Sequence, residues 1–195
     1  MPRNLASVHN GATTGGDGVN LDSLIDDTEA TNWASLGAPV EGRQVTVRLD
    51  PSKPSWQVAR VQVSAHLRPP NPADPNDPAQ SRFSALRQFQ ILACQATAGV
   101  DCDDDADFTV VFTSPADAFP AIAPRPRAPD LILRSFAIPR TRATHVRLRV
   151  LTNQCTGAPD YQGEQDNDPR AATDCSDASP QALNVRAAEL QVFGR

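Results

Sequence analysis

The sequence of 195 residues has little of several features that would point to particular functions. No run approaches the roughly 20 apolar residues that a transmembrane helix requires, so we expect no membrane span. Aromatic residues make up only 5%, and Lys53 is the single lysine. The formal net charge of −5 argues against nucleic acid as a partner. The hydrophobic content of 39% is nevertheless ordinary for a globular domain, and the length suits one domain over 1–195.

Sequence motifs for catalysis are also missing. The chain has no H-E-x-x-H for zinc hydrolysis, no G-x-S-x-G elbow and no glycine-rich phosphate loop. Its three histidines, His9, His66 and His145, stand in no recognisable motif. A small hydrolase with a site built from distant residues stays open, because catalytic groups need only be close in space. We expect the module itself to be non-catalytic.

Four cysteines form two sequence-local pairs, Cys94 with Cys102 and Cys155 with Cys175. Sequence alone allows three pairings, and the local one is the simplest because each pair brackets a polar loop. A zinc site is the competing interpretation, but no pair has the C-x-x-C spacing and the histidines are distant in sequence. We expect disulfides, and therefore a secreted or extracellular protein.

Segments with a two-residue period dominate the chain and predict strands that bury one face. Pro/Asp/Asn-rich stretches separate them, and the 18 prolines leave little room for long helices. The fold class that this predicts is all-β: an antiparallel β-sandwich of jelly-roll type, with about eight strands and long Pro/Asp-rich loops. The predicted strands include 44–49, 59–67, 88–92, 108–114, 131–138, 144–151 and 187–193.

The stretch "LIDDTEATNW", Leu24 to Trp33, places acidic and hydroxyl groups in a loop just before a predicted strand. Glu189 lies in the last predicted strand. Because the first and last strands of a jelly roll often lie close together, Asp26 and Glu189 could meet. Two carboxylates approach closely in a partly buried place only if one is protonated or a cation lies between them. Oxygen ligands of this kind suit calcium; the alternative is a hydrogen-bonded turn without an ion.

Three segments resemble a known family: "LIDDTEATNWAS" at the metal loop, "ATHVRLRVL" at the penultimate strand and "AAELQVFG" at the terminal strand. They are similar to discoidin-like domains, also called coagulation factor V/VIII type C or galactose-binding-like domains, which include the family 32 carbohydrate-binding modules. The similarity runs from Asn4 to Gly194, which gives a core of about 4–194. The details also resemble C-terminal modules of secreted actinobacterial peptidases of the fungalysin type.

The resemblance implies a structural calcium ion that ties the chain ends together. Asp26 and Glu189 would contribute carboxylates, and Thr31 both its hydroxyl and its backbone oxygen. Backbone oxygens would come from Ser23, Thr28 and Ala188. One departure from the family is that Asp27 stands where a glycine commonly permits a turn with positive φ. Aspartate tolerates that conformation better than most residues, so the loop can still close.

Ligand-binding candidates come from the loops and strand ends. A sugar site needs an aromatic face and planar polar groups, and "YQGEQDNDP" at 161–169 offers both, although a plain exposed loop or a second calcium site are alternatives. The segment 101–107 ("DCDDDAD") lacks an EF-hand pattern and is predicted to be a solvated hairpin tip. Arg147 and Arg149 are predicted to lie on a solvated sheet surface. The candidate ligand-binding residues are Trp56, His66, Arg82, Tyr161, Glu164 and Asp166.

These expectations combine into a non-catalytic, calcium-stabilised binding module of a secreted protein that recognises carbohydrate or another cell-surface ligand. The alternative is a structural or protein-interaction domain that packs on a neighbouring, upstream catalytic domain of a secreted hydrolase. Fold alone does not choose between them. An exposed aromatic in a concave patch opposite the termini would favour the first, and an exposed apolar patch the second.

Overall fold

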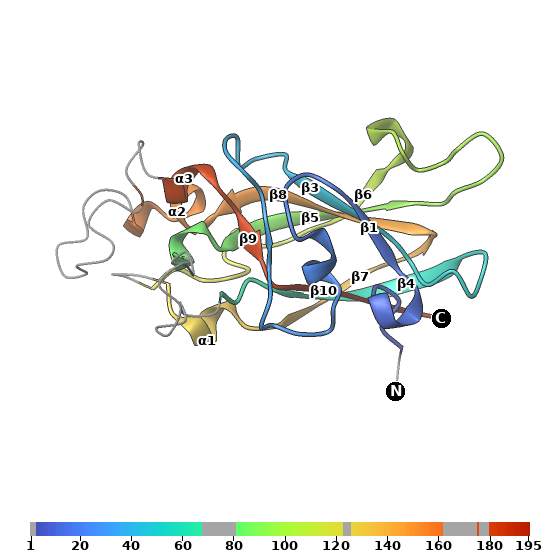
Figure 1. Cartoon of the computed structure of the whole chain (residues 1–195), viewed down its shortest axis with the longest axis horizontal. Coiled ribbons are helices and arrows are strands. Elements are labelled where there is room, and N and C mark those ends of the chain that lie inside the picture. Colours follow the sequence, from blue (N-terminus) through green and yellow to red (C-terminus); the bar gives the residue numbers. More distant parts are fainter. Residues whose placement is uncertain (1–2, 68–80, 123–125, 162–174, 176–179) are drawn as a thin grey trace.

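The computed structural model describes residues 3–67, 81–122, 126–161, 175 and 180–195, and in these ranges two antiparallel sheets pack face to face (Figure 1). The upper sheet in that view has the order β1-β3-β8-β5-β6 and the lower one β10-β4-β7. The predicted all-β antiparallel sandwich is therefore confirmed. The strands of the upper sheet are β1 (Thr13–Gly16), β3 (Gln44–Arg48), β8 (His145–Asn153), β5 (Leu86–Cys94) and β6 (Thr109–Thr113). Those of the lower sheet are β10 (Glu189–Gly194), β4 (Trp56–Ser64) and β7 (Arg134–Ala143).

A short pair of strands, β2 (Trp33–Ala34) and β9 (Arg186–Ala187), forms a third sheet beside the sandwich. The helices are single turns in the connections, and none in the described ranges is long and apolar enough to cross a membrane. The α-helices are α1 (Ala128–Leu131), α2 (Gln154–Gly157) and α3 (Pro180–Leu183). The 3₁₀ turns are η1 (Val8–Asn10), η2 (Leu21–Leu24), η3 (Arg82–Ser84), η4 (Asp105–Asp107) and η5 (Pro159–Tyr161).

The alternating sequence pattern explains the sandwich, because the apolar positions of each strand point into the space between the sheets. Phe89 of β5 meets Phe136 of β7 edge to face across that space, with ring centroids 5.3 Å apart. The predicted inward positions Val47, Val63 and Leu148 are all fully buried. The core therefore lies between the sheets, and function must come from outer faces, edges and loops.

The strand predicted over 131–138 is displaced in the structure. Leu131 belongs to α1, and β7 begins at Arg134 and continues past Pro139 to Ala143. Proline lacks the backbone N–H that a ladder needs, but β7 is an edge strand that pairs only with β4. An edge strand tolerates proline, and so the strand runs through it.

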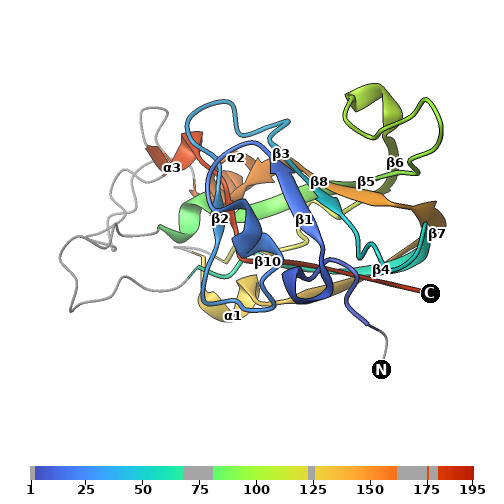
Figure 2. The same ribbon diagram turned by 45° about the vertical axis from the view of Figure 1, so that its right-hand side comes forward.

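The two ends of β4 mark the two ends of the sandwich. Gln57 exchanges backbone hydrogen bonds with Arg195 at 2.9 and 3.1 Å, whereas Ser64 pairs with Glu189, where β10 begins. Both chain termini lie at the first end, which we call the terminal end, whereas α1, α2 and α3 lie at the other, which we call the loop end (Figure 2). The local disulfide pairing is confirmed, since Cys94 bonds to Cys102 and Cys155 to Cys175.

Candidate functional site

The loop after η2 closes on its own aspartate and turns through an unusual backbone conformation. The Asp26 carboxylate accepts hydrogen bonds from the Thr28 backbone N–H at 3.2 Å and from the Thr31 hydroxyl at 2.5 Å. Asp27 adopts φ +64°, the left-handed region that glycine favours. The prediction that aspartate can replace glycine in this turn is thus confirmed.

Asp27 also ties the loop to the N-terminal segment. Its carboxylate accepts hydrogen bonds from the Asn4 amide at 2.8 Å and from the Ser7 hydroxyl. The Asn4 side-chain oxygen in turn accepts the backbone N–H of Val192, in β10, at 3.0 Å. One network therefore joins the first residues, the acidic loop and the last strand.

Glu189 is the least satisfied carboxylate in the described structure. It is 1% exposed, and neither carboxylate oxygen has a hydrogen-bond partner within the described ranges. Burial raises its pKa to about 9, with further contributions from the negative charges of Asp27 and Asp26. The backbone amides of Asp27 and Thr28 face the carboxylate and partly offset this rise in pKa, although neither reaches hydrogen-bonding geometry. A buried, unpaired carboxylate is costly unless it is protonated or meets a cation.

The donor chemistry around Glu189 fits a hard cation. No group of three or more His, Cys, Asp or Glu side chains suited to a metal occurs in the part of the chain that the structure describes. A cation beside Glu189 would therefore also need backbone and hydroxyl oxygens, which calcium accepts readily and zinc does not. Of the predicted ligands, Ser23 and Thr28 are half-buried, Thr31 is exposed and Ala188 is fully buried.

Tyr161 lies in a buried cluster beside the Cys155–Cys175 disulfide. Its ring meets Phe83 edge to face at 5.2 Å, and its hydroxyl accepts the Ile122 backbone N–H at 2.8 Å. The side chain is fully covered, so its ring presents no face to a ligand in this structure. The other two candidates from this loop, Glu164 and Asp166, lie outside the described residues.

His66 follows the Ser64 end of β4, at the loop end of the sandwich, and Arg82 begins η3, which contacts α2 and α3 at the same end. Both are half-buried. The Nδ1 atom of His66 is buried and has no hydrogen-bond partner among the described residues. With Tyr161, whose ring packs on Phe83 of η3, these are the described candidates that the fold brings to the end opposite the termini.

Trp56 lies at the other end of β4, roughly 26 Å from Ser64 by the rise of an extended strand. It is 6% exposed, donates its indole N–H to the Asp50 carbonyl at 2.8 Å and is covered by the Lys53 ammonium at 4.4 Å. A groove of about 810 Å³ adjoins it, with Arg48 and His145 among its lining residues. The described ligand-binding candidates therefore do not form one site.

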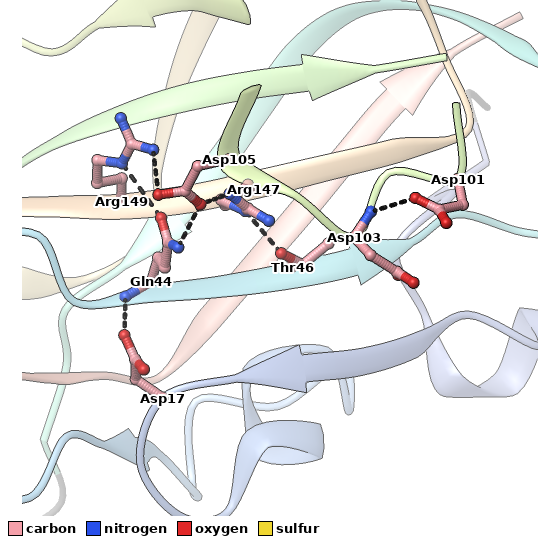
Figure 3. A network of polar contacts seen from close by, with 8 residues as sticks. All are labelled: Asp17, Gln44, Thr46, Asp101, Asp103, Asp105, Arg147 and Arg149. Carbon is pink, nitrogen blue, oxygen red and sulfur yellow. Dashed lines mark hydrogen bonds and ion pairs between the residues drawn. The ribbon is translucent and has the colours of Figure 1, made fainter. Parts of the chain in front are cut away.

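The hairpin tip at 101–107 is largely exposed, as predicted, and its Asp105 joins the sheet arginines in an ordered network (Figure 3). Arg147, 4% exposed, pairs with the Asp105 carboxylate and donates to the Thr46 hydroxyl at 2.7 Å. Its guanidinium lies 3.7 Å from the centre of the Phe108 ring. The prediction of a solvated surface was wrong for Arg147 because the hairpin after β5 folds over it.

The whole-chain comparisons concern the fold. No family model matches the sequence, and no curated protein sequence does. Among solved structures, module CpGH89CBM32-5 from Clostridium perfringens, in complex with GalNAc-β-1,3-galactose, is 15% identical with a TM-score of 0.51; the match covers 98% of this chain and 100% of that chain.

Two further family 32 carbohydrate-binding modules are similar. The module of Clostridium perfringens NanJ, in complex with galactose, is 10% identical with a TM-score of 0.51, over 97% of this chain and 98% of that one. The module of AlyQ, in complex with 4,5-unsaturated mannuronic acid, is 15% identical with a TM-score of 0.50, over 99% and 98%. At such identities the likeness establishes the fold, and the chain has the galactose-binding-like sandwich that the resemblance predicts.

Proposed function

We propose that the protein is a non-catalytic carbohydrate-binding module of a secreted protein, stabilised by a structural calcium ion. The observation that carries the proposal is the likeness over nearly the whole chain to modules solved with galactose, a galactose-containing disaccharide or a uronate. The described connections at the loop end, which hold α1, α2 and η3, support a role in binding, because loops held by a rigid sandwich commonly carry it.

We place the saccharide contacts at the loop end, with His66 and Arg82 as polar groups. The half-buried imidazole of His66 suits a sugar hydroxyl, and the guanidinium fork of Arg82 suits a hydroxyl or carboxylate. The fully covered ring of Tyr161 would support this end from beneath by packing on Phe83. Trp56 would play no part, since it lies at the opposite end.

We propose that the calcium ion is held by the Asp26 and Glu189 carboxylates together with oxygens of Ser23, Thr28, Thr31 and Ala188. When bound, the ion neutralises the carboxylates that otherwise repel each other. Its role would be to fix the loop against β10 rather than to assist a reaction. The two disulfides support export, and we propose a secreted hydrolase, such as a fungalysin-type peptidase, as the parent chain.

A glycan array tests the function directly. The protein is applied in calcium, with a chelator-treated sample alongside. We expect a saccharide signal that H66A and R82A remove, and that H9A and R48A retain because His9 and Arg48 are exposed near the terminal end. A blank array from folded protein would move the assignment to the packing role on a neighbouring domain.

A further inference from the structure

The outer face of the lower sheet differs in charge from the rest of the molecule. In β4, β7 and β10 the register places Val61 beside Val192 and Phe136, all directed toward the core. The alternate residues Arg60, Phe193 and Ala137 therefore share the outward side, because successive side chains of a strand point to opposite faces. This face is not covered by another sheet (Figure 1).

Arginines gather on this outward side. Arg140 and Arg142 are exposed on β7, and Arg195 is exposed directly after β10. Three of the four arginines of this face line one shallow hollow of about 340 Å³ with Phe193: Arg60, Arg140 and Arg195. We call Arg60, Arg140, Arg142 and Arg195 the arginine face.

Acidic partners for these arginines are missing from the described structure. The three strands contain a single acidic residue, Glu189, and it is buried. No ion pair within the described ranges involves the arginine face. The Arg60 guanidinium instead lies 4.3 Å from the centre of the Phe193 ring, and Arg195 donates to the Gln57 side chain at 3.3 Å. The stacking holds the Arg60 guanidinium in place while leaving it without a countercharge.

The net charge of −5 does not cancel this local positive field. Much of the described acidic charge lies in the hairpin after β5 and in the loop after η2. At physiological ionic strength charges are screened over about 8 Å, so a ligand on the arginine face responds chiefly to the arginines beneath it. Guanidinium groups bind carboxylate and sulfate through paired N–H donors and are less strongly hydrated than lysine.

We propose that the arginine face binds an acidic polysaccharide through its carboxylate or sulfate groups. The floor of the face is shallow because Ala59, Ala137 and Gly194 are small, and so an extended chain can lie across the strands. Gln62 and Gln191 pair across β4 and β10 on the same side and offer amides to sugar hydroxyls.

A membrane fits this face less well than a polysaccharide. Phe193 is covered by Arg60, and the outward positions of these three fully described strands hold no exposed long aliphatic side chain that could enter a bilayer. The inference does not rest on the loop-end saccharide site, because the arginine face lies on a different surface. Its test is therefore done in chelator, where the proposed calcium ion is absent.

Affinity electrophoresis through gels that contain polygalacturonate, heparin or neutral galactan tests the proposal. We expect retardation by the two acidic polymers at low salt, and an affinity about tenfold weaker in the double variant R140Q/R142Q, as the loss of two exposed charge contacts implies. Both side chains are exposed, so the melting temperature should stay unchanged.

The matched control is R48Q/K53Q, which removes two exposed positive charges away from this face. Equal weakening in the control would overturn the proposal, because binding would then follow net charge alone. Absence of retardation by both acidic polymers would also overturn it. Binding to vesicles of anionic lipid without binding to either polymer would replace the polysaccharide with a membrane surface. Retardation by neutral galactan in calcium reports separately on the proposed loop-end function.

Discussion

The carboxylates of Asp105 and Glu189 differ in their exposure to solvent and in the partners that surround them. Asp105 is exposed over 67% of its side chain, accepts a hydrogen bond from Gln44 at 2.9 Å and pairs with Arg147 and Arg149. Glu189 is buried beside Asp26 and Asp27, with no cationic side chain and no hydrogen-bond partner among the described residues. A cluster of aspartates in the sequence thus indicates little by itself, since what distinguishes a cation site is a buried carboxylate without a protein partner.

The largest expected effect comes from removing calcium. At a free calcium concentration 100 times the Kd, binding stabilises the fold by about 2.7 kcal/mol, or roughly 5–10 °C in a domain of this size. We expect E189Q to lose this whole calcium-induced shift. In chelator it should melt at or above the wild-type temperature, because burial raises the pKa of Glu189 to about 9, so the wild type must take up a proton on folding and glutamine need not. Thermal melts of both proteins in calcium and in chelator check this. An undiminished calcium shift in E189Q would reject the role of Glu189.

A smaller effect is expected for R147M, which keeps an apolar stem but removes the charge. The variant loses the Asp105 pair, the hydrogen bond to Thr46 and the stacking on Phe108, and we expect a loss of about 1–2 kcal/mol. Denaturant unfolding in calcium and in chelator should give the same loss. A loss confined to one condition would mean that the hairpin and the calcium loop are energetically coupled.

Part of this contrast was predictable from the sequence. The alternating strands predict the sandwich, and closure of a jelly roll predicts that Asp26 and Glu189 approach each other. Burial of Tyr161 was not predictable, because a tyrosine in a polar loop looks the same in sequence whether its ring is packed or exposed. The pairing of Arg147 with Asp105 depends on how the hairpin folds over the sheet, which no local pattern encodes.

Only part of the arginine face could be predicted from the sequence. The pattern of 59–67 places Arg60 on the side opposite Val61 and Val63, and this parity is confirmed. The strand order places β4 between β7 and β10. This order gathers arginines from three distant segments of the sequence on one face. Strand order is a non-local property that alternation within one segment does not determine.

D105N should have a still smaller effect, below about 1 kcal/mol at pH 7, since Asp105 is largely exposed. The hydrogen bond from Gln44, followed by the charges of Arg147 and Arg149, holds the pKa of Asp105 below its ordinary value of 3.8. Its stabilising contribution is therefore present above that value and is lost as the pH falls through the lower folded pKa. The difference in unfolding free energy between wild type and D105N should shrink on acidification. A difference that grows instead would contradict the ion pair.

The smallest effect is expected for D103N, in the same acidic hairpin. Asp103 is exposed, its backbone N–H donates to the Asp101 carboxylate at 3.3 Å, and its charge acts on His145. Its replacement should change stability by less than about 0.5 kcal/mol. Urea titrations of D103N and D105N measured side by side would show whether partner geometry, rather than acidity, decides the effect. Equal losses in the two variants would remove that distinction.

Calorimetric titration of calcium into chelator-treated, dialysed protein tests the central claim most directly. The account predicts a calcium site that is present in the wild type and in D105N and is missing in E189Q. The assignment of Glu189 as the cation ligand would be contradicted if E189Q retained the site or if D105N lost it. It would also be contradicted if the folded wild type bound no calcium.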